Sequence, residues 1–159
     1  MELISAKMNR AIFTSLFNLY VHELSEYNPW LATQMNEEGI YLPNEIDSFF
    51  TTIGYEPYII YDDKYPVGFV VISKQGPDSG ETTTCCIDEL FVVKTSRQKG
   101  LATQFVNNFL KQEKGGVCGL AILKENTPAK RFWENLIIQY DTNYICRDEG
   151  SVYVYNFKI

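Results

Sequence analysis

The sequence has few of the side chains that metal sites use, and few basic ones. It has one histidine, His22, and its four cysteines (Cys85, Cys86, Cys118 and Cys146) lack the paired spacing of a zinc site. Lysine and arginine number 14 against 20 aspartate and glutamate residues, which gives a formal net charge of −6. We therefore expect no metal ion and no nucleic-acid partner, because nucleic-acid binding relies on basic surfaces.

Long apolar runs are also missing. No stretch approaches the ~20 apolar residues that a membrane-spanning helix needs. Residues 1–5 (MELIS) lack the basic start and the long apolar segment of a signal peptide. We expect a cytoplasmic protein without a membrane partner, whose cysteines are reduced and buried.

The composition is that of a folded protein. Hydrophobic residues make up 45% of the 159 residues and aromatic residues 14%, which is enough to bury a sizeable core. The sequence shows no internal repeat, no low-complexity tract and no domain boundary. We interpret residues 1–159 as a single domain.

Hydrophobic periodicity predicts the element order β-α-α-β-β-β-α-β-α-β-β, a mixed α/β fold. The expected strands cover residues 1–6, 58–61, 67–73, 82–93, 117–123, 138–146 and 151–158. The expected helices, with Asn9, Asn44 and Thr127 as N-caps, cover residues 9–24, 44–53, 101–114 and 127–136. His22 falls opposite the apolar stripe of the first helix, which favours a solvent-facing side chain. The helical crossover after residue 93 predicts that the strands at 82–93 and 117–123 are parallel neighbours.

The stretch from Ile87 to Leu110 combines the parts of an anion site. A β-branched and aromatic run ends at Val93, a basic turn (RQKG) follows at 97–100, and helical spacing of apolar residues begins at Leu101. The free N–H groups of a first helical turn and the helix dipole both favour a bound anion. Glycine in the turn lets the backbone approach a diphosphate closely. We interpret the anion as the pyrophosphate of a nucleotide-containing cofactor; the alternative is an ordinary turn with solvated basic residues.

Two motifs resemble those of the GNAT superfamily of acyl-CoA-dependent N-acetyltransferases. The family's Arg/Gln-x-x-Gly-x-Gly/Ala signature is present as Arg97-Gln98-Lys99-Gly100-Leu101-Ala102. Its Asn-x-x-Ala-x-x-Phe-Tyr signature follows about 30 residues later, as Asn126-Thr127-Pro128-Ala129-Lys130-Arg131-Phe132-Trp133. The resemblance covers residues 57–159 well and residues 1–56 only in their helical pattern. It implies a GNAT-like fold, with a mixed sheet of six to seven strands, about four helices, and two splayed parallel strands that bind acyl-CoA.

The resemblance also assigns a cofactor site. It implies that the backbone at 90–92 pairs with the pantetheine of coenzyme A, that the turn and helix start bind its pyrophosphate, and that Asn126 helps to hold the pantetheine arm. The cofactor-binding residues expected on this basis are Leu90, Phe91, Val92, Arg97, Gln98, Lys99, Gly100, Leu101, Ala102, Asn126 and Trp133.

The resemblance further implies how catalysis proceeds. The backbone N–H of Val92 would polarise the thioester carbonyl, and a carboxylate would accept the amine proton. Glu89 is the first candidate for this base and Asp88 the second; the alternative is that one of these two adjacent strand residues faces outward and is merely solvated. In the family, the tyrosine that ends the second motif usually acts as the general acid. Here Trp133 occupies that position, and its indole N–H cannot serve as a proton donor at neutral pH.

Two smaller departures from the family pattern are Lys94, where proline is common, and Ile137, where a glycine usually follows the last helix. We expect an N-acetyltransferase that moves an acetyl group from acetyl-CoA to a primary amine of a small molecule or peptide by direct attack. The alternative is a non-catalytic acyl-CoA-binding sensor or interaction module. The acceptor site would lie among the first two helices and the loops near 25–43 and 74–82. The exposed closing strands could pair between subunits and give a homodimer.

Overall fold

The computed structural model describes residues 2–74 and 83–159. Most of the loop expected at 74–80, and the first residue of the strand expected from residue 82, lie outside the described residues. Among the helices that are described, none is both long and apolar enough to cross a membrane.

The element order agrees with the predicted one, with three short 3-10 helices added. The strands are β1 (Glu2–Ser5), β2 (Tyr55–Asp62), β3 (Tyr65–Ser73), β4 (Cys85–Val92), β5 (Val117–Leu123), β6 (Ile145–Glu149) and β7 (Val152–Lys158). The helices are α1 (Arg10–Leu24), α2 (Pro43–Thr51), α3 (Leu101–Gln112) and α4 (Thr127–Ile137), and the 3-10 helices are η1 (Ala6–Met8), η2 (Pro29–Thr33) and η3 (Lys94–Ser96).

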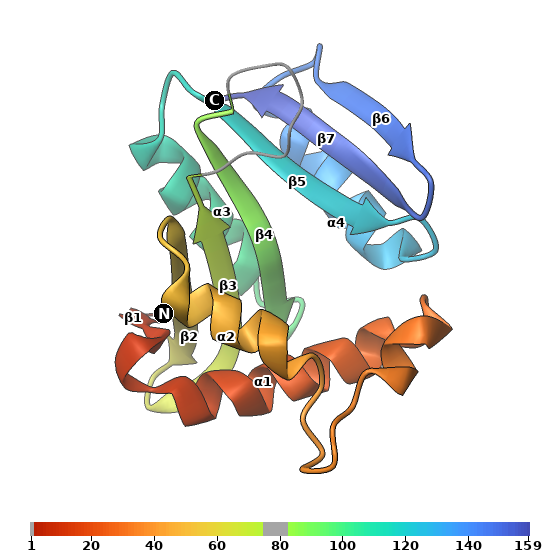
Figure 1. Cartoon of the computed structure of the whole chain (residues 1–159). Coiled ribbons are helices and arrows are strands. Elements are labelled where there is room, and N and C mark those ends of the chain that lie inside the picture. The colour runs from red at the N-terminus through yellow and green to blue at the C-terminus, as the bar shows by residue number, and fades with distance from the viewer. Residues whose placement is uncertain (1, 75–82) are drawn as a thin grey trace. The chain divides into compact units, whose positions relative to one another are not determined.

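The seven strands that the structure describes form one mixed sheet in the order β1-β2-β3-β4-β5-β7-β6 (Figure 1). The predicted mixed α/β class is therefore confirmed. The parallel pairing of β4 with β5 is also confirmed, with Cys85 opposite Cys118 and Cys86 opposite Gly119.

The chain forms two compact units, which are described separately. The first contains Met1–Ile72 and Glu89–Ala102, and the second contains Ser73–Asp88 and Thr103–Ile159. The boundary crosses β4 between Asp88 and Glu89 and crosses α3 after its first two residues.

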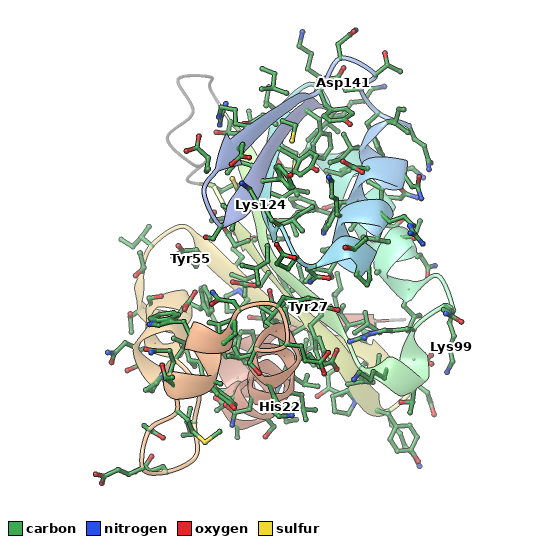
Figure 2. All side chains as sticks on the ribbon, turned by 90° about the vertical axis from the view of Figure 1, so that its right-hand side faces the viewer. His22, Tyr27, Tyr55, Lys99, Lys124 and Asp141 are labelled. Carbon is green, nitrogen blue, oxygen red and sulfur yellow. The ribbon has the colours of Figure 1, made fainter. Side chains whose placement is uncertain are left out.

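In the first unit, α1 and α2 lie against one face of the sheet (Figure 1), and an aromatic core packs between them. Phe13 and Phe17 lie one helical turn apart on α1, so both face the same side. The ring centroid of Phe13 lies 4.8 Å from that of Phe69 on β3 and 6.2 Å from that of Phe49 on α2. All four side chains are buried. His22 lies on the exposed side of α1, as predicted (Figure 2).

The start of α3 packs against a second apolar cluster of the first unit. Ile60, Val67 and Val92 form its buried centre, and Leu101 and Ala102 pack against it. The apolar residues that begin α3 thus anchor the turn that precedes them to the end of β4.

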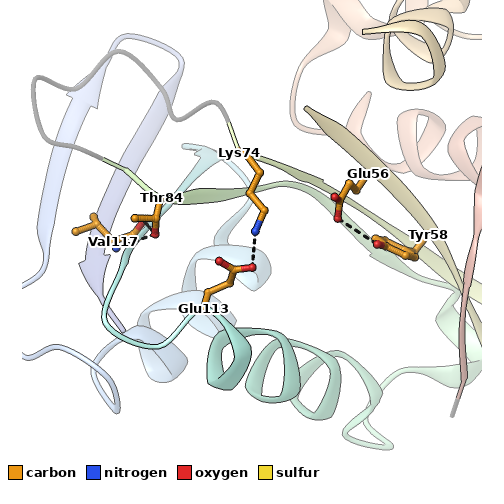
Figure 3. A network of polar contacts seen from close by, with 6 residues as sticks. All are labelled: Glu56, Tyr58, Lys74, Thr84, Glu113 and Val117. Atoms are coloured by element: carbon orange, nitrogen blue, oxygen red, sulfur yellow. Dashed lines mark hydrogen bonds and ion pairs between the residues drawn. The ribbon is translucent and has the colours of Figure 1, made fainter. Parts of the chain in front are cut away.

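In the second unit, β7 pairs antiparallel with both β5 and β6, and α4 buries Trp133, Leu136 and Ile137. Polar contacts join the segments around this core. Tyr140 donates a hydrogen bond to Oδ1 of Asn107 at 2.7 Å. Figure 3 shows the ion pair of Lys74 with Glu113 in the same unit.

Two of the predicted caps and one predicted strand need correction. Asn9 is the N-cap of α1, as predicted, although its side chain makes no capping hydrogen bond within the described residues. Asn44 lies inside α2, because Pro43, whose fixed φ suits a first helical position, begins the helix after Leu42. Thr127 is the first residue of α4 rather than its cap.

The strand predicted at 138–146 begins only at Ile145. The chain turns directly after α4 instead, because the N–H groups of Tyr140 and Asp141 both donate to the carbonyl of Ile137 at 2.9 Å. Apolar residues in this turn, such as Ile138, led to the prediction of a strand here, although Ile138 is 54% exposed and not buried.

Candidate active site

Burial along β4 does not alternate as it does in a regular half-buried strand. Cys85, Cys86 and Ile87 are buried, the next three residues are half-buried, and Phe91 and Val92 are buried again. Asp88 and Glu89 are therefore both half-buried, and the expected solvent exposure of one of them is not observed. An irregular strand of this kind can direct adjacent side chains toward partly buried surroundings.

Glu89 accepts a hydrogen bond at Oε2 from the hydroxyl of Tyr20 on α1. The ring of Tyr20 packs against Phe17, Phe69 and Phe91. Burial raises the pKa of Tyr20 well above its usual 10.0, and the charge of Glu89 raises it further. The phenol therefore stays protonated and donates to the carboxylate.

Asp88 has a different environment, in the second unit. Burial raises the pKa of its carboxyl group, and a hydrogen bond with Ser73 partly offsets that effect. Its Oδ2 is buried, and no hydrogen-bond partner for this atom occurs in the described part of the chain.

The end of β4 turns the backbone of Val92 away from β3. The N–H of Val93 donates to the carbonyl of Val67 on β3 at 2.9 Å. A methyl group placed on Gly68 of β3 would lie 2.2 Å from the Phe91 carbonyl oxygen, so Phe91 also faces β3. Because strand residues alternate, the N–H and C=O of Val92 point to the other edge, and the same alternation places those of Leu90 there.

The side chain of Arg97 is held by three contacts within the first unit. Its Nε donates to the Val92 carbonyl at 2.7 Å, and its Nη2 lies 2.7 Å from Oε2 of Glu23 on α1. The guanidinium carbon also lies 5.5 Å from the centroid of the Phe91 ring. The charge of this motif residue is therefore paired with Glu23, and its guanidinium is directed toward the strand end and α1.

The turn after Arg97 has the backbone of an anion nest. Gln98 has φ 63° and Gly100 has φ 77°, so both are left-handed, and α3 begins at Leu101. Among the described residues, we observe no acceptor for the N–H groups from Gln98 to Ala102. Successive free N–H groups in such a turn, at the positive end of a helix, form a site that fits a diphosphate.

Lys99 adds a positive charge beside this nest. It is more than half exposed (Figure 2), and its Nζ lies 4.0 Å from Oδ2 of Asp62, too far for a hydrogen bond.

In the ranges 2–74 and 83–159, no group of three or more His, Cys, Asp or Glu side chains could hold a metal ion.

The second motif lies in the second unit. Oδ1 of Asn126 accepts a hydrogen bond from the N–H of Ala129 at 3.1 Å, so Asn126 caps α4. Trp133 is 8% exposed, and its ring centroid lies 5.1 Å from that of Phe132. Ile137, where a glycine was expected, is fully buried at the end of α4. Asn126 and Trp133 thus have clear structural roles in α4.

The expected site residues therefore divide between the units. The first unit brings together Glu89, the backbone at 90–92 and the whole turn at 97–102, whereas Asn126 and Trp133 belong to the second. Sequence reasoning missed Tyr20 and Glu23 as partners of site residues. A tyrosine within the phenylalanine-rich stripe of α1 was a usable signal, because a buried hydroxyl needs a hydrogen-bond partner.

The chain is thus an α/β protein with a mixed sheet, in which an anion-type nest lies between strand β4 and the start of the crossover helix α3. The sequence model of the acetyltransferase (GNAT) family matches residues 13–136. The chain therefore belongs to the GNAT acetyltransferase family. No curated protein sequence matches it.

Several solved structures share the fold. The acetyltransferase of Thermus thermophilus is 14% identical, with 100% of this chain and 98% of that one covered and a TM-score of 0.64. The PaiA N-acetyltransferase of Thermoplasma acidophilum, in complex with coenzyme A, is 14% identical over 100% of both chains, with a TM-score of 0.58. NAA60 of Arabidopsis thaliana, in complex with a bisubstrate analogue, is 19% identical over 75% of this chain and 84% of its own, with a TM-score of 0.53.

Proposed function

We propose that this protein is an N-acetyltransferase that moves the acetyl group of acetyl-CoA to a primary amine of a small molecule or peptide by direct attack. The nest at Gln98–Gly100, which leads into the free N–H groups of α3, is the observation that carries the proposal. Membership of the GNAT acetyltransferase family supports acyl transfer, and the anion nest supports a cofactor that carries a diphosphate.

In this reaction the turn at 97–102 and the end of β4 would have separate roles. The N–H groups from Gln98 to Ala102 would hold the diphosphate of the cofactor, with Lys99 adding charge. Acetyl-CoA, when bound, supplies a thioester carbonyl that an amine can attack. The N–H of Val92, which points away from β3, would donate to the oxygen of that carbonyl.

Glu89 would accept the proton of the attacking amine, directly or through water. It is half-buried, and Tyr20 donates a hydrogen bond to it. Asp88 is the second candidate, because burial raises the pKa of its carboxyl group toward the range in which a base works at neutral pH. A general base of this kind typically contributes about 100- to 10,000-fold to the rate.

Calorimetric titration with coenzyme A tests the nest. Gly100 is left-handed, and a methyl group placed on it meets no atom of the described residues within 4 Å. Gly100→Ala therefore costs about 1 kcal/mol of backbone strain, and its methyl group would occupy the space in which the diphosphate approaches the backbone. We expect coenzyme A to bind at least about tenfold more weakly, a loss of about 1.4 kcal/mol.

Gly150→Ala is the matched control. Gly150 has φ 75° and lies in the turn between β6 and β7, and a methyl group placed on it also meets no described atom within 4 Å. Both variants should lose similar stability, but only Gly100→Ala should lose affinity for coenzyme A. Equal affinities in the two variants would exclude the nest as the diphosphate site.

A non-catalytic acyl-CoA-binding module is the second candidate function. The observation that favours it is Trp133, which is buried in α4 at the position where the family's general-acid tyrosine would lie. Release of free thiol from acetyl-CoA with a panel of primary amines separates the two. We expect thiol release that depends on the amine; tight acetyl-CoA binding with no release above the rate of hydrolysis would favour the binding module.

A further inference from the structure

The hydroxyl of Tyr20 makes a contact to which the proposed reaction assigns no role. It donates a hydrogen bond to Oε2 of Glu89, and the two residues come from α1 and β4. They lie 69 positions apart in the sequence, so only the tertiary fold brings them together. Both belong to the first unit.

Three aromatic neighbours hold the ring of Tyr20 in place. Its centroid lies 5.9 Å from that of Phe17, 5.5 Å from that of Phe69 and 5.7 Å from that of Phe91. These are separations and tilted or edge geometries that aromatic pairs favour. The ring has little freedom to turn, so its hydroxyl points in a fixed direction.

The hydroxyl also remains protonated, and therefore a donor, well above neutral pH. Burial raises the pKa of Tyr20 well above 10.0, and Glu89 adds to this effect through its charge and the hydrogen bond. A carboxylate can accept several hydrogen bonds at once. The bond from Tyr20 can thus fix the orientation of Glu89 without excluding an amine from the same carboxylate.

We propose that Tyr20 is a positioning residue, whose hydroxyl holds the Glu89 carboxylate in the orientation that accepts a proton from the acceptor amine. This inference rests on the proposed function, in which Glu89 is the base. Orientation matters to such a step, since a misplacement of about 1 Å can cost about 100-fold in rate.

The test is Tyr20→Phe, which keeps the ring and its packing and removes only the hydroxyl. Thiol release from acetyl-CoA, with butylamine as acceptor and with water alone, gives kcat and KM. We expect kcat to fall about tenfold, as loss of positioning predicts, while KM for acetyl-CoA stays within about twofold because the nest is untouched. An equal rise in KM would mark a structural disturbance and overturn the inference.

Tyr58→Phe is the matched control. Tyr58 also donates to a glutamate, Glu56, at 3.1 Å, and both lie on β2 in the same unit (Figure 3). Loss of that hydroxyl should leave kcat unchanged. A fall in kcat equal to that of Tyr20→Phe would show that loss of any such hydroxyl slows the reaction, and would overturn the inference.

The Glu89→Gln background separates this inference from the proposed function. If Tyr20 acts through Glu89, Tyr20→Phe lowers kcat no further once the carboxylate is gone. Wild-type kcat in Tyr20→Phe, together with a large loss in Glu89→Gln, overturns the inference and leaves the proposed function standing. Full activity in Glu89→Gln overturns this inference and leaves the proposed function standing with Asp88 as the base, whereas no amine-dependent thiol release by the wild type overturns the proposed function and this inference with it.

Discussion

At the scale of single residues, Gly68 marks a close approach between strands β3 and β4 of the first unit. A methyl group at this position would lie 2.2 Å from the Phe91 carbonyl oxygen and 3.2 Å from the Val92 Cα. Both are backbone atoms, so no side-chain rotation can relieve the contact. The Phe91–Val92 peptide of the candidate site can keep its position only if residue 68 has no side chain.

We predict that Gly68→Ala lowers the free energy of unfolding by about 1–3 kcal/mol, the usual cost of overpacking a core. Urea denaturation measures this directly. It should also weaken acetyl transfer, because the strand end that carries the Val92 N–H has to shift. A variant as stable and as active as the wild type would contradict the close packing of β3 on β4.

At the scale of elements, Arg97 connects α1 to the end of β4. Its guanidinium bonds Glu23 on one side and the Val92 carbonyl on the other. This geometry predicts a structural role for the side chain, in addition to the backbone role that the motif implies for the turn.

Glu23→Gln, Arg97→Gln and the double variant test this connection. Both side chains are partly exposed, so solvent screens the pair and the coupling energy should be only about 0.5–1 kcal/mol. Affinity for coenzyme A should change by less than about threefold in each variant, because the charge faces α1. A tenfold weaker affinity in Arg97→Gln alone would instead place the guanidinium on the diphosphate.

The sequence was sufficient to predict the order of these elements but not all their ends. Strand β5 and the parallel crossover were predictable because Val117–Leu123 is almost entirely apolar and a clear helical period precedes it. The cap of α2 was not, because Pro43 and Asn44 are both favourable near a helix start and only packing decides between them. Residues 138–144 carry a strand-like composition, and only the hydrogen bonds of the chain show that they turn.

The candidate site was predictable to the same extent. The turn at 97–102 was found because its chemistry is local, with a glycine and free N–H groups in consecutive residues. The hydrogen bond between Tyr20 and Glu89 and the ion pair between Arg97 and Glu23 were not, because each joins residues far apart in the sequence. Sequence patterns report local chemistry, whereas these contacts depend on how α1 lies on the sheet of the first unit.

At the scale of the whole molecule, buried thiols predict a loss of stability in alkali. Burial, with the charges of Asp88 and Cys85, raises the pKa of Cys86 from 9.0 to about 12. Above about pH 9 the unfolded chain loses this proton, whereas the folded chain keeps it. The free energy of unfolding should therefore fall by about 1.4 kcal/mol per pH unit from this group as pH rises from about 9 to 12.

Urea denaturation of Cys86→Ala between about pH 8 and 11 tests this linkage, because this range begins below the ordinary pKa of 9.0 and stays below the raised pKa of about 12. The variant should be less stable at the lower end and should lose stability less steeply as pH rises. Val70→Ala is the control, because it removes a buried apolar group that does not titrate and should lower the whole curve without changing its slope. An unchanged slope in Cys86→Ala would show that this thiol does not contribute.

The most direct test of the proposed activity is mass-spectrometric detection of the acetylated amine, with free thiol followed in parallel. Wild-type protein with acetyl-CoA and a panel of primary amines should give acetylated amine and free thiol in equal amounts. Glu89→Gln should bind acetyl-CoA as tightly as the wild type but form product about 100-fold or more slowly, the usual loss of a general base. A wild-type protein that binds acetyl-CoA and acetylates no amine of the panel would contradict the proposed activity, and a Glu89→Gln variant as fast as the wild type would contradict the role of Glu89 as the base.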